Sequence, residues 1–387
     1  MIRFAELLVA LPILFAIYAY VAYPLILWAT ARAYETPMPR PAVDTPFVSI
    51  VVPAYNEEAQ IAGAIDALLA QDYPAACLQI LILSDASTDR TDEIVDTYAS
   101  RGVELMRMNE RSGKTKAENA AVQRLRGEII VNTDASIRLH PAAVRELVAH
   151  MSDPQVGVAS GRDISVSAMP RAGNVTEAGY VNYEMWVRSL ESRAGGIVGA
   201  SGSCYAIRKD LHKIQIPEDL SRDFCAALTA RLYGFRAVSV DTAICLVPST
   251  PSLKREYRRK VRTISRGMDT LYYRRELLTP SRGGNFAWKI FSHKLCRWAL
   301  PISVIPGLVG LAILSRTHLW AEIVLIAGGL VALVALAGAL WPKDRQMPHV
   351  ISLAAFGVAA NLAVLNAFWR VIYGHQDHVW EPTRRSA

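Results

Sequence analysis

Long apolar runs lie at both ends of the chain and leave a segment of mixed polarity between them. The runs contain a single charged residue, Glu6, and cover residues 4–31, 299–315, 323–341 and 350–369. A helix that crosses a bilayer needs about 20 mainly apolar residues. We therefore predict one transmembrane helix over residues 1–31 and about three over residues 299–374. The first run is much longer than the apolar part of a signal peptide, so we expect it to be retained as a span.

The segment between these runs alternates between two hydrophobic patterns. Short apolar runs, most of them rich in β-branched residues, predict strands at residues 47–53, 78–85, 103–108 and 128–134. Runs with helical spacing occur at residues 61–71, 91–101 and 116–126. Strands that alternate with helices of this length indicate an α/β fold, in which a mostly parallel sheet carries helices on both faces. Ligands of such sheets bind beyond the carboxyl ends of the strands.

Composition and charge complete the predicted layout. We expect a proline-rich linker over residues 32–46, a folded domain over 47–283, an interfacial helix over 284–298 and a tail over 375–387. The interfacial helix is predicted because aromatic residues alternate there with Lys289, Lys294 and Arg297. The net charge of +7 is concentrated in residues 254–275, which are dense in lysine and arginine. Such density beside membrane spans is typical of the cytoplasmic side of the inner membrane.

The cysteines do not form a recognisable framework. The chain has five, an odd number, and they are scattered without a CxxC pair. This argues against a set of disulfides or a zinc site and suits a reducing compartment.

Carboxylates follow three of the predicted strands at the point where each strand ends. Glu57 follows the first strand, Asp85 and Asp89 follow the second, and Asp134 follows the fourth. Each one alone can be explained as a helix cap or a first-turn acid. Together on one edge of a sheet they predict a site for a cation, a metal ion or the N–H groups of a nucleobase. Lys114 adds a candidate phosphate contact, with a surface lysine as the alternative.

Seven motifs, in this order, resemble the family 2 glycosyltransferases with a GT-A fold. They are VSIVVPAYNEE (48–58), SDASTDRT (84–91), SGKTKAEN (112–119), TDAS (133–136), GASGSCYAIRKD (199–210), LSRDFCAALTARLYGFRAV (220–238) and EYRRKVRTISRG (256–267). The tail VWEPTRRS (379–386) is similar to a tail found in membrane members. With the membrane layout, the chain resembles hyaluronan, poly-N-acetylglucosamine and cellulose synthases more than the soluble members. The expected fold is therefore a GT-A domain, a nucleotide-diphospho-sugar transferase, joined to transmembrane helices.

The resemblance implies a role for each matching residue. Substrate contacts are implied for Pro53, Glu57, Asp85, Lys114, Gly202 and Ser203, and Asp134 would in addition hold Mg²⁺ or Mn²⁺ on the nucleotide diphosphate. Asp223 matches the acid that acts as general base, and Arg259 and Arg262 would stabilise the leaving diphosphate.

The reaction that the resemblance implies is inverting transfer of a sugar from a nucleotide sugar, UDP-linked in our interpretation. The acceptor would be a polysaccharide or a lipid-linked sugar in cell-envelope glycan synthesis. Membrane lipids and other envelope-synthesis proteins are the further partners expected, and nucleic acid is not.

Two positions depart from the family motifs. Ser136 stands where relatives carry the second acid of the DxD motif, which weakens the expected metal site. Thr263 stands where they carry an aromatic ring that would stack on acceptor sugar, which disfavours the synthesis of long chains. Two alternatives therefore stay open: an inactive scaffold that binds sugar nucleotide, and a transferase of one sugar to a lipid carrier. A transporter is disfavoured because the predicted spans carry no buried charge.

Overall fold

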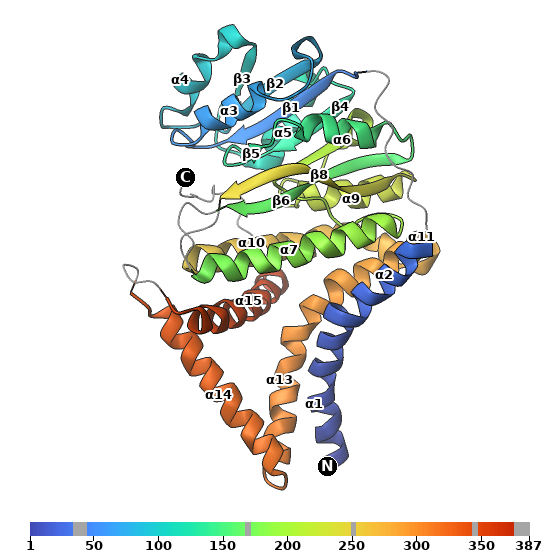
Figure 1. Ribbon diagram of the computed structural model, residues 1–387, viewed down its shortest axis with the longest axis vertical. Coiled ribbons are helices and arrows are strands. Elements are labelled where there is room, and N and C mark those ends of the chain that lie inside the picture. Colours follow the sequence, from blue (N-terminus) through green and yellow to red (C-terminus); the bar gives the residue numbers. More distant parts are fainter. Residues whose placement is uncertain (34–44, 167–171, 249–252, 343–346, 375–387) are drawn as a thin grey trace.

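The structure is a computed structural model that describes residues 1–33, 45–166, 172–248, 253–342 and 347–374. Figure 1 shows a layered α/β domain, with a group of long helices extending away from it. Most of the predicted linker and all of the predicted tail lie outside the described residues.

The described residues form one sheet of eight strands, in the order β3-β2-β1-β4-β7-β6-β8-β5. The strands are β1 (Val48–Ala54), β2 (Leu78–Ser84), β3 (Val103–Arg107), β4 (Ile129–Thr133), β5 (Arg138–Leu139), β6 (Val156–Val166), β7 (Cys204–Arg208) and β8 (Arg236–Pro248). β1 to β4 are parallel, which confirms the sequence-based expectation. β7 is antiparallel to both β4 and β6, so the second half of the sheet is mixed.

The two faces of the sheet are covered by different helices. The helices of the domain are α3 (Ile61–Leu69), α4 (Thr91–Asp96), α5 (Lys114–Ala121), α6 (Ala143–Met151), α7 (Ala172–Arg193), α8 (Lys209–His212), α9 (Arg222–Leu232), α10 (Leu253–Tyr273) and α11 (Pro280–Gly283). Shorter 3₁₀ turns are η2 (Ala75–Cys77), η3 (Ala99–Arg101), η4 (Val122–Arg124) and η5 (Arg275–Leu278). Successive side chains of a strand point to opposite faces. Ile50 and Val52 accordingly pack with α3 and α6, whereas Val51 packs with α5 and α9.

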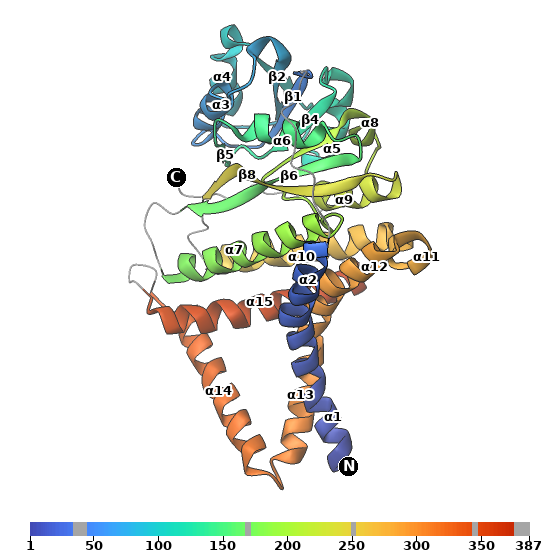
Figure 2. The ribbon, with the colours of Figure 1, turned by 45° about the vertical axis from the view of Figure 1, so that its right-hand side comes forward.

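Within the described residues, four helices are long and apolar enough to cross a membrane: Ile2–Arg32, Asn285–Leu314, Leu319–Ala339 and His349–Ile372. The first joins α1 (Ile2–Ile17), the π-helical η1 (Tyr18–Ala22) and α2 (Tyr23–Ala33), and the second joins α12 (Asn285–Ile290), the π-helical η6 (Phe291–Leu295) and α13 (Cys296–Leu314). The last two are α14 (Leu319–Ala339) and α15 (His349–Ile372). Figures 1 and 2 show that α1, α13 and α14 run away from the domain.

α15 has a different direction from the other three. In both views it lies across them, beneath α7 and α10 (Figures 1 and 2). Asn366 donates a hydrogen bond of 2.9 Å to the Tyr257 hydroxyl of α10, and Lys260 Nζ lies 4.7 Å from the Phe356 ring centre. α15 is therefore attached to the helix of the domain that is richest in arginine.

The segment 284–298 differs from the predicted interfacial helix. Its residues begin the continuous helix that leads into α13. Lys289 and Arg297 are 3% and 8% exposed, so these side chains point into the protein. The physical reason is that α7 supplies buried acidic partners for this helix, which the sequence alone did not reveal.

Candidate active site

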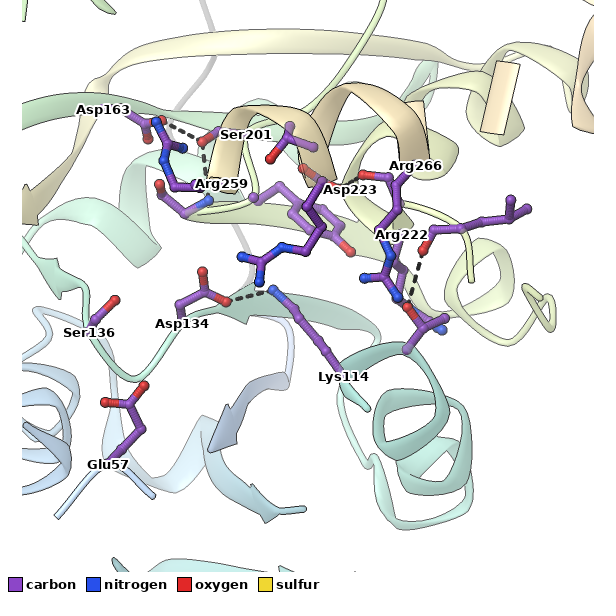
Figure 3. A pocket seen from close by; sticks show the side chains of 18 residues that line it. Glu57, Lys114, Asp134, Ser136, Asp163, Ser201, Arg222, Asp223, Arg259 and Arg266 are labelled. Carbon is purple, nitrogen blue, oxygen red and sulfur yellow. Dashed lines mark hydrogen bonds and ion pairs between the residues drawn. The ribbon is translucent and has the colours of Figure 1, made fainter. Parts of the chain in front are cut away.

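One cavity of about 260 Å³ brings most of the predicted site residues together. Its lining includes Glu57, Lys114, Asp134, Gly202, Ser203, Asp223, Arg259 and Arg262. In Figure 3, Lys114 and Asp134 point toward each other, and Asp223 lies on the opposite side of the cavity from Glu57. The cavity thus lies beyond the carboxyl ends of β1 and β4, where ligands of open α/β sheets bind.

Lys114 and Asp134 form the ion pair at the centre of the cavity. Lys114 Nζ lies 2.6 Å from Asp134 Oδ1, and both side chains are largely buried. Burial alone would lower the pKa of Lys114, but the carboxylates of Asp134 and Glu118 outweigh it and raise that pKa. Lys114 therefore stays positively charged and can receive an anion.

Asp85 and Pro53 do not line the cavity. Asp85 accepts hydrogen bonds from the backbone N–H groups of Ser112, at 2.7 Å, and Gly113, at 2.8 Å. Pro53 is buried in β1, opposite Leu83 of β2. In this structure Asp85 holds the turn from which α5 and Lys114 begin, while its predicted contact with a nucleoside stays a prediction.

Asp223 lies in the first turn of α9 and faces the cavity. Its Oδ1 accepts a hydrogen bond from the Ser221 hydroxyl. On the other side, a Cβ added to Gly202 would lie 2.9 Å from Asp223 Oδ2. Glycine at position 202 thus lets the loop 197–203 approach the carboxylate closely.

α10 contributes three arginines to the cavity: Arg259, Arg262 and Arg266. They are spaced three and four residues apart, so they share one face of the helix. Glu256 binds both Nε and Nη2 of Arg259, at 2.8 and 2.7 Å, which fixes the guanidinium. Arg255, four residues before Arg259 on α10, is exposed and is not part of the lining.

Asp163 is a residue of the cavity that the sequence analysis missed. It lies on β6 and accepts a hydrogen bond of 2.7 Å from the Ser201 hydroxyl. Ser201 in turn is held through its N–H, which donates to the Ser160 hydroxyl at 2.8 Å. Asp163 lies inside β6, which continues to Val166, whereas Asp134 comes directly after the end of β4, so the strand-end signal used for the other acids would not have found it.

Arg222 is a second missed residue, and it joins the two sides of the cavity. It is 5% exposed and lies 3.7 Å from the carboxylate of Glu118, which is fully buried. It also donates to Asn119 Oδ1 and, at 2.9 Å, to the carbonyl of His212. Burial raises the pKa of Glu118, although Lys114 and Arg222 oppose this. The contacts join α5, which carries Lys114, to α9, which carries Asp223.

A divalent cation fits here only together with a bound diphosphate. Asp134 supplies one carboxylate and Ser136 one hydroxyl to the same cavity. The described residues include no group of three or more His, Cys, Asp or Glu side chains that could hold a metal ion. Mg²⁺ is commonly bound through one or two carboxylates plus substrate phosphates and water, so this donor set is sufficient when the substrate supplies oxygens.

Comparison with known proteins identifies the domain. Residues 49–214 match the family described as glycosyl transferase family 2. The chain contains a family 2 glycosyltransferase domain. This confirms the resemblance read from the motifs, as well as the expected enzyme class.

Two relatives are each identical to this glycosyltransferase at about a quarter of the aligned positions. An "N-acetylglucosaminyltransferase" of Rhizobium sp. (strain N33) is 27% identical over 304 residues, which are 73% of this chain and 66% of the relative. One of Rhizobium meliloti (strain 1021) is 27% identical over 324 residues, 76% of this chain and 74% of the relative. The chain thus spans about two thirds to three quarters of their length.

A solved structure shares the fold of this glycosyltransferase. It is the mannosyltransferase PcManGT from Pyrobaculum calidifontis, in complex with GDP-Man and Mn²⁺. The TM-score is 0.73 at 22% identity, and the match covers 95% of this chain and 99% of that one. The likeness confirms the predicted fold class, a GT-A-like α/β domain joined to long apolar helices.

Proposed function

We propose that this glycosyltransferase is an inverting enzyme that transfers N-acetylglucosamine from UDP-N-acetylglucosamine to an acceptor at a membrane. The observation that carries the proposal is the cavity itself, in which the Lys114–Asp134 pair faces Asp223 and the arginines of α10. The choice of sugar follows the two rhizobial relatives, both named N-acetylglucosaminyltransferases. The match with a structure that holds GDP-Man concerns the fold alone, so it does not select the donor.

In the proposed reaction, an acceptor hydroxyl attacks the anomeric carbon of the donor from the face opposite the diphosphate. Asp223 accepts the proton of that hydroxyl, which is the task of a general base. The bond from the anomeric carbon to the diphosphate oxygen breaks, and UDP leaves with the electron pair. Lys114, Arg259 and Arg262 bind the departing diphosphate, whose charge develops next to them. Asp134 and Ser136 would hold a divalent cation, which would neutralise further diphosphate charge.

The acceptor is proposed to be lipid-linked or a growing cell-envelope glycan at the inner membrane. α10 lines the cavity with one face and carries α15 on another, and α15 belongs to the long apolar helices. The cavity therefore lies one helix layer from the proposed membrane surface. Thr263, at the position where an aromatic ring is expected in processive relatives, favours the addition of one or few sugars.

The experiment that tests the proposal uses the full chain in lipid nanodiscs. UDP-N-acetylglucosamine, UDP-glucose and GDP-mannose are supplied in turn with a bacterial membrane lipid extract, and release of the nucleotide diphosphate is measured. We expect release with UDP-N-acetylglucosamine and its loss on addition of a chelator. A preference for GDP-mannose would contradict the proposed donor. Full activity in excess chelator would contradict the proposed requirement for a divalent cation. Binding of UDP without any turnover would favour the inactive scaffold.

A further inference from the structure

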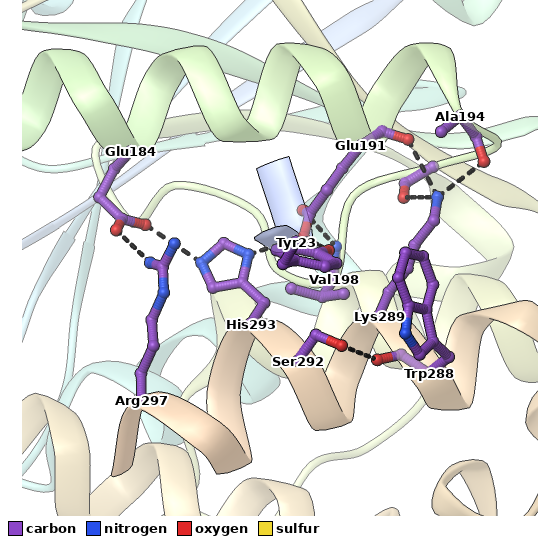
Figure 4. A network of polar contacts seen from close by, with 11 residues as sticks. Tyr23, Glu184, Glu191, Ala194, Val198, Trp288, Lys289, Ser292, His293 and Arg297 are labelled. Atoms are coloured by element: carbon purple, nitrogen blue, oxygen red, sulfur yellow. Dashed lines mark hydrogen bonds and ion pairs between the residues drawn. The ribbon is translucent and has the colours of Figure 1, made fainter. Parts of the chain in front are cut away.

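Glu191 of α7 is a buried carboxylate at which three parts of the chain meet (Figure 4). Its Oε1 accepts hydrogen bonds from the Tyr23 hydroxyl of α2, at 2.5 Å, and from His293 Nδ1 of η6, at 2.6 Å. Its Oε2 accepts the backbone N–H of Val198 at 3.3 Å. The N-terminal helix, the α12–α13 helix and the loop after α7 are therefore tied to one side chain.

Lys289 of α12 reinforces the same junction. It is 3% exposed, and its Nζ donates to the carbonyls of Glu191, Ala194 and Gly196 at 3.1, 2.8 and 3.0 Å. All three ammonium protons are used on the end of α7 and the start of the following loop. The carbonyls at the end of a helix lack partners within that helix, so this lysine satisfies groups that would otherwise be buried without one.

The loop held in this way forms one wall of the cavity. It continues from Val198 to Ser201, Gly202 and Ser203, which line the cavity. Val198 also belongs to the apolar cluster that contains Phe224, the residue after Asp223. Since Gly202 already approaches the Asp223 carboxylate closely, a displacement of the loop would displace the proposed general base.

The electrostatics of the junction favour a charged Glu191. Burial alone would raise its pKa, but His293 and the Tyr23 hydroxyl outweigh burial and lower it. The neighbouring Glu184 shares His293 with Glu191, at 3.1 Å from His293 Nε2, and in addition pairs with Arg297. Among the described residues no hydrogen bond or ion pair joins Glu184 to the loop, so of these two glutamates only Glu191 connects His293 to it.

We infer that Glu191 is a positioning residue through which the membrane helices hold the loop 197–203, which forms one wall of the active site. The long helices would then set the geometry of the reaction in addition to anchoring the domain. The expected effect on catalysis rests on the proposed function, whereas the role of Glu191 in holding the loop does not depend on it.

Two tyrosines of the N-terminal helix give a matched pair for the test. Tyr23→Phe removes the hydroxyl that binds Glu191. Tyr18→Phe removes a hydroxyl that binds Ser292 at 2.7 Å and Trp288 at 2.9 Å. Both changes take one oxygen from the N-terminal helix. The Tyr18 hydroxyl contacts only the α12–α13 helix, whereas the Tyr23 hydroxyl binds Glu191 and through it the loop 197–203.

Each variant is prepared as the full chain in nanodiscs and compared with wild type by two measurements. Hydrogen exchange of the peptide covering residues 197–203 reports the loop directly, because the Val198 amide donates to Glu191. We expect faster exchange in Tyr23→Phe and no change in Tyr18→Phe. UDP release from UDP-N-acetylglucosamine should fall about 10- to 100-fold in Tyr23→Phe, with unchanged affinity for UDP, since small misplacements of catalytic groups have effects of this size.

The two arms separate failure of the inference from failure of the proposed function. Equal exchange of the loop in both variants would overturn the inference, whatever the enzyme does. Equal turnover of the two variants would overturn the link to catalysis. If wild type released no UDP, the proposed function would fail, while the exchange arm would still decide whether Tyr23 and Glu191 hold the loop.

Discussion

At the scale of single residues, Asp223 is the side chain whose proposed role can be separated most cleanly from stability. Asp223→Asn keeps an oxygen that can accept the Ser221 hydroxyl, so the position of the side chain is preserved. It removes the ability to take a proton. Because a positioned general base contributes about 10²- to 10⁴-fold in rate, we expect at least about 100-fold slower UDP release, with unchanged melting temperature and UDP affinity.

Asp219→Asn is the matched control for this substitution. Asp219 precedes Asp223 by four residues and does not line the cavity, so its turnover should stay within about twofold of wild type, as for a surface change. Near wild-type turnover of a well-folded Asp223→Asn enzyme would exclude Asp223 as the base. Asp163 would then be the next acid of the cavity to test.

At the scale of elements, α10 offers a comparison between arginines inside and outside the cavity. Arg262 lines the cavity, whereas Arg274 donates to Thr229 at 3.2 Å and lies beyond the end of α10. Loss of a donor that stabilises developing charge costs about 10²- to 10³-fold in kcat. We expect a loss of this order in Arg262→Ala and little change in Arg274→Ala, measured as UDP release. Equal losses would indicate a general role of basic charge at the lipid surface.

The contact between α5 and α9 makes a prediction about stability. Arg222→Met removes one of the two cations beside the buried Glu118 carboxylate, the other being Lys114. Removing one partner of a buried ion pair costs about 3 to 5 kcal/mol of unfolding free energy. The double variant Glu118→Leu/Arg222→Met removes both charges, so most of the loss should be recovered. Chemical unfolding of the detergent-solubilised protein measures both. A double variant that is less stable than the single one would show that the pair itself stabilises the fold.

At the scale of the whole molecule, the direction of α15 predicts how many times the chain crosses the membrane. α1, α13 and α14 extend away from the domain and α15 lies beneath it, so three crossings are expected (Figure 2). Residue 373, at the end of α15, should then be on the side of the domain. Residue 316, between α13 and α14, should be on the opposite side.

Single cysteines in a Cys77→Ser background test this arrangement in intact cells, because the other native cysteines are buried. A membrane-impermeant maleimide added outside should label Arg316→Cys and leave Tyr373→Cys unlabelled. Labelling of Tyr373→Cys from outside would show that α15 crosses the bilayer.

The sequence by itself determined the parallel half of the sheet and the candidate membrane helices. β1, β2 and β4 are mainly apolar because strands buried on both faces need apolar side chains at most positions, whereas the edge strand β3 is only partly buried. The same alternation of strands and helices placed Glu57 and Asp134 at one edge, and the structure brings both to the cavity. The order of the motifs identified the domain, since they mark the loops at that edge.

Only the tertiary structure decided the contacts between segments far apart in the chain. From the sequence, Lys289 is predicted to lie at the membrane surface. In the structure it binds carbonyls of α7 and the residues after it, which precede Lys289 by about 95 residues in the chain. Arg222 gains its role from the packing of α9 against α5, which no local pattern encodes. α15 has the length and polarity of a span, and its direction follows from its packing on α10. Length and periodicity describe a helix alone, whereas its direction and the charge of its surroundings depend on what it packs against.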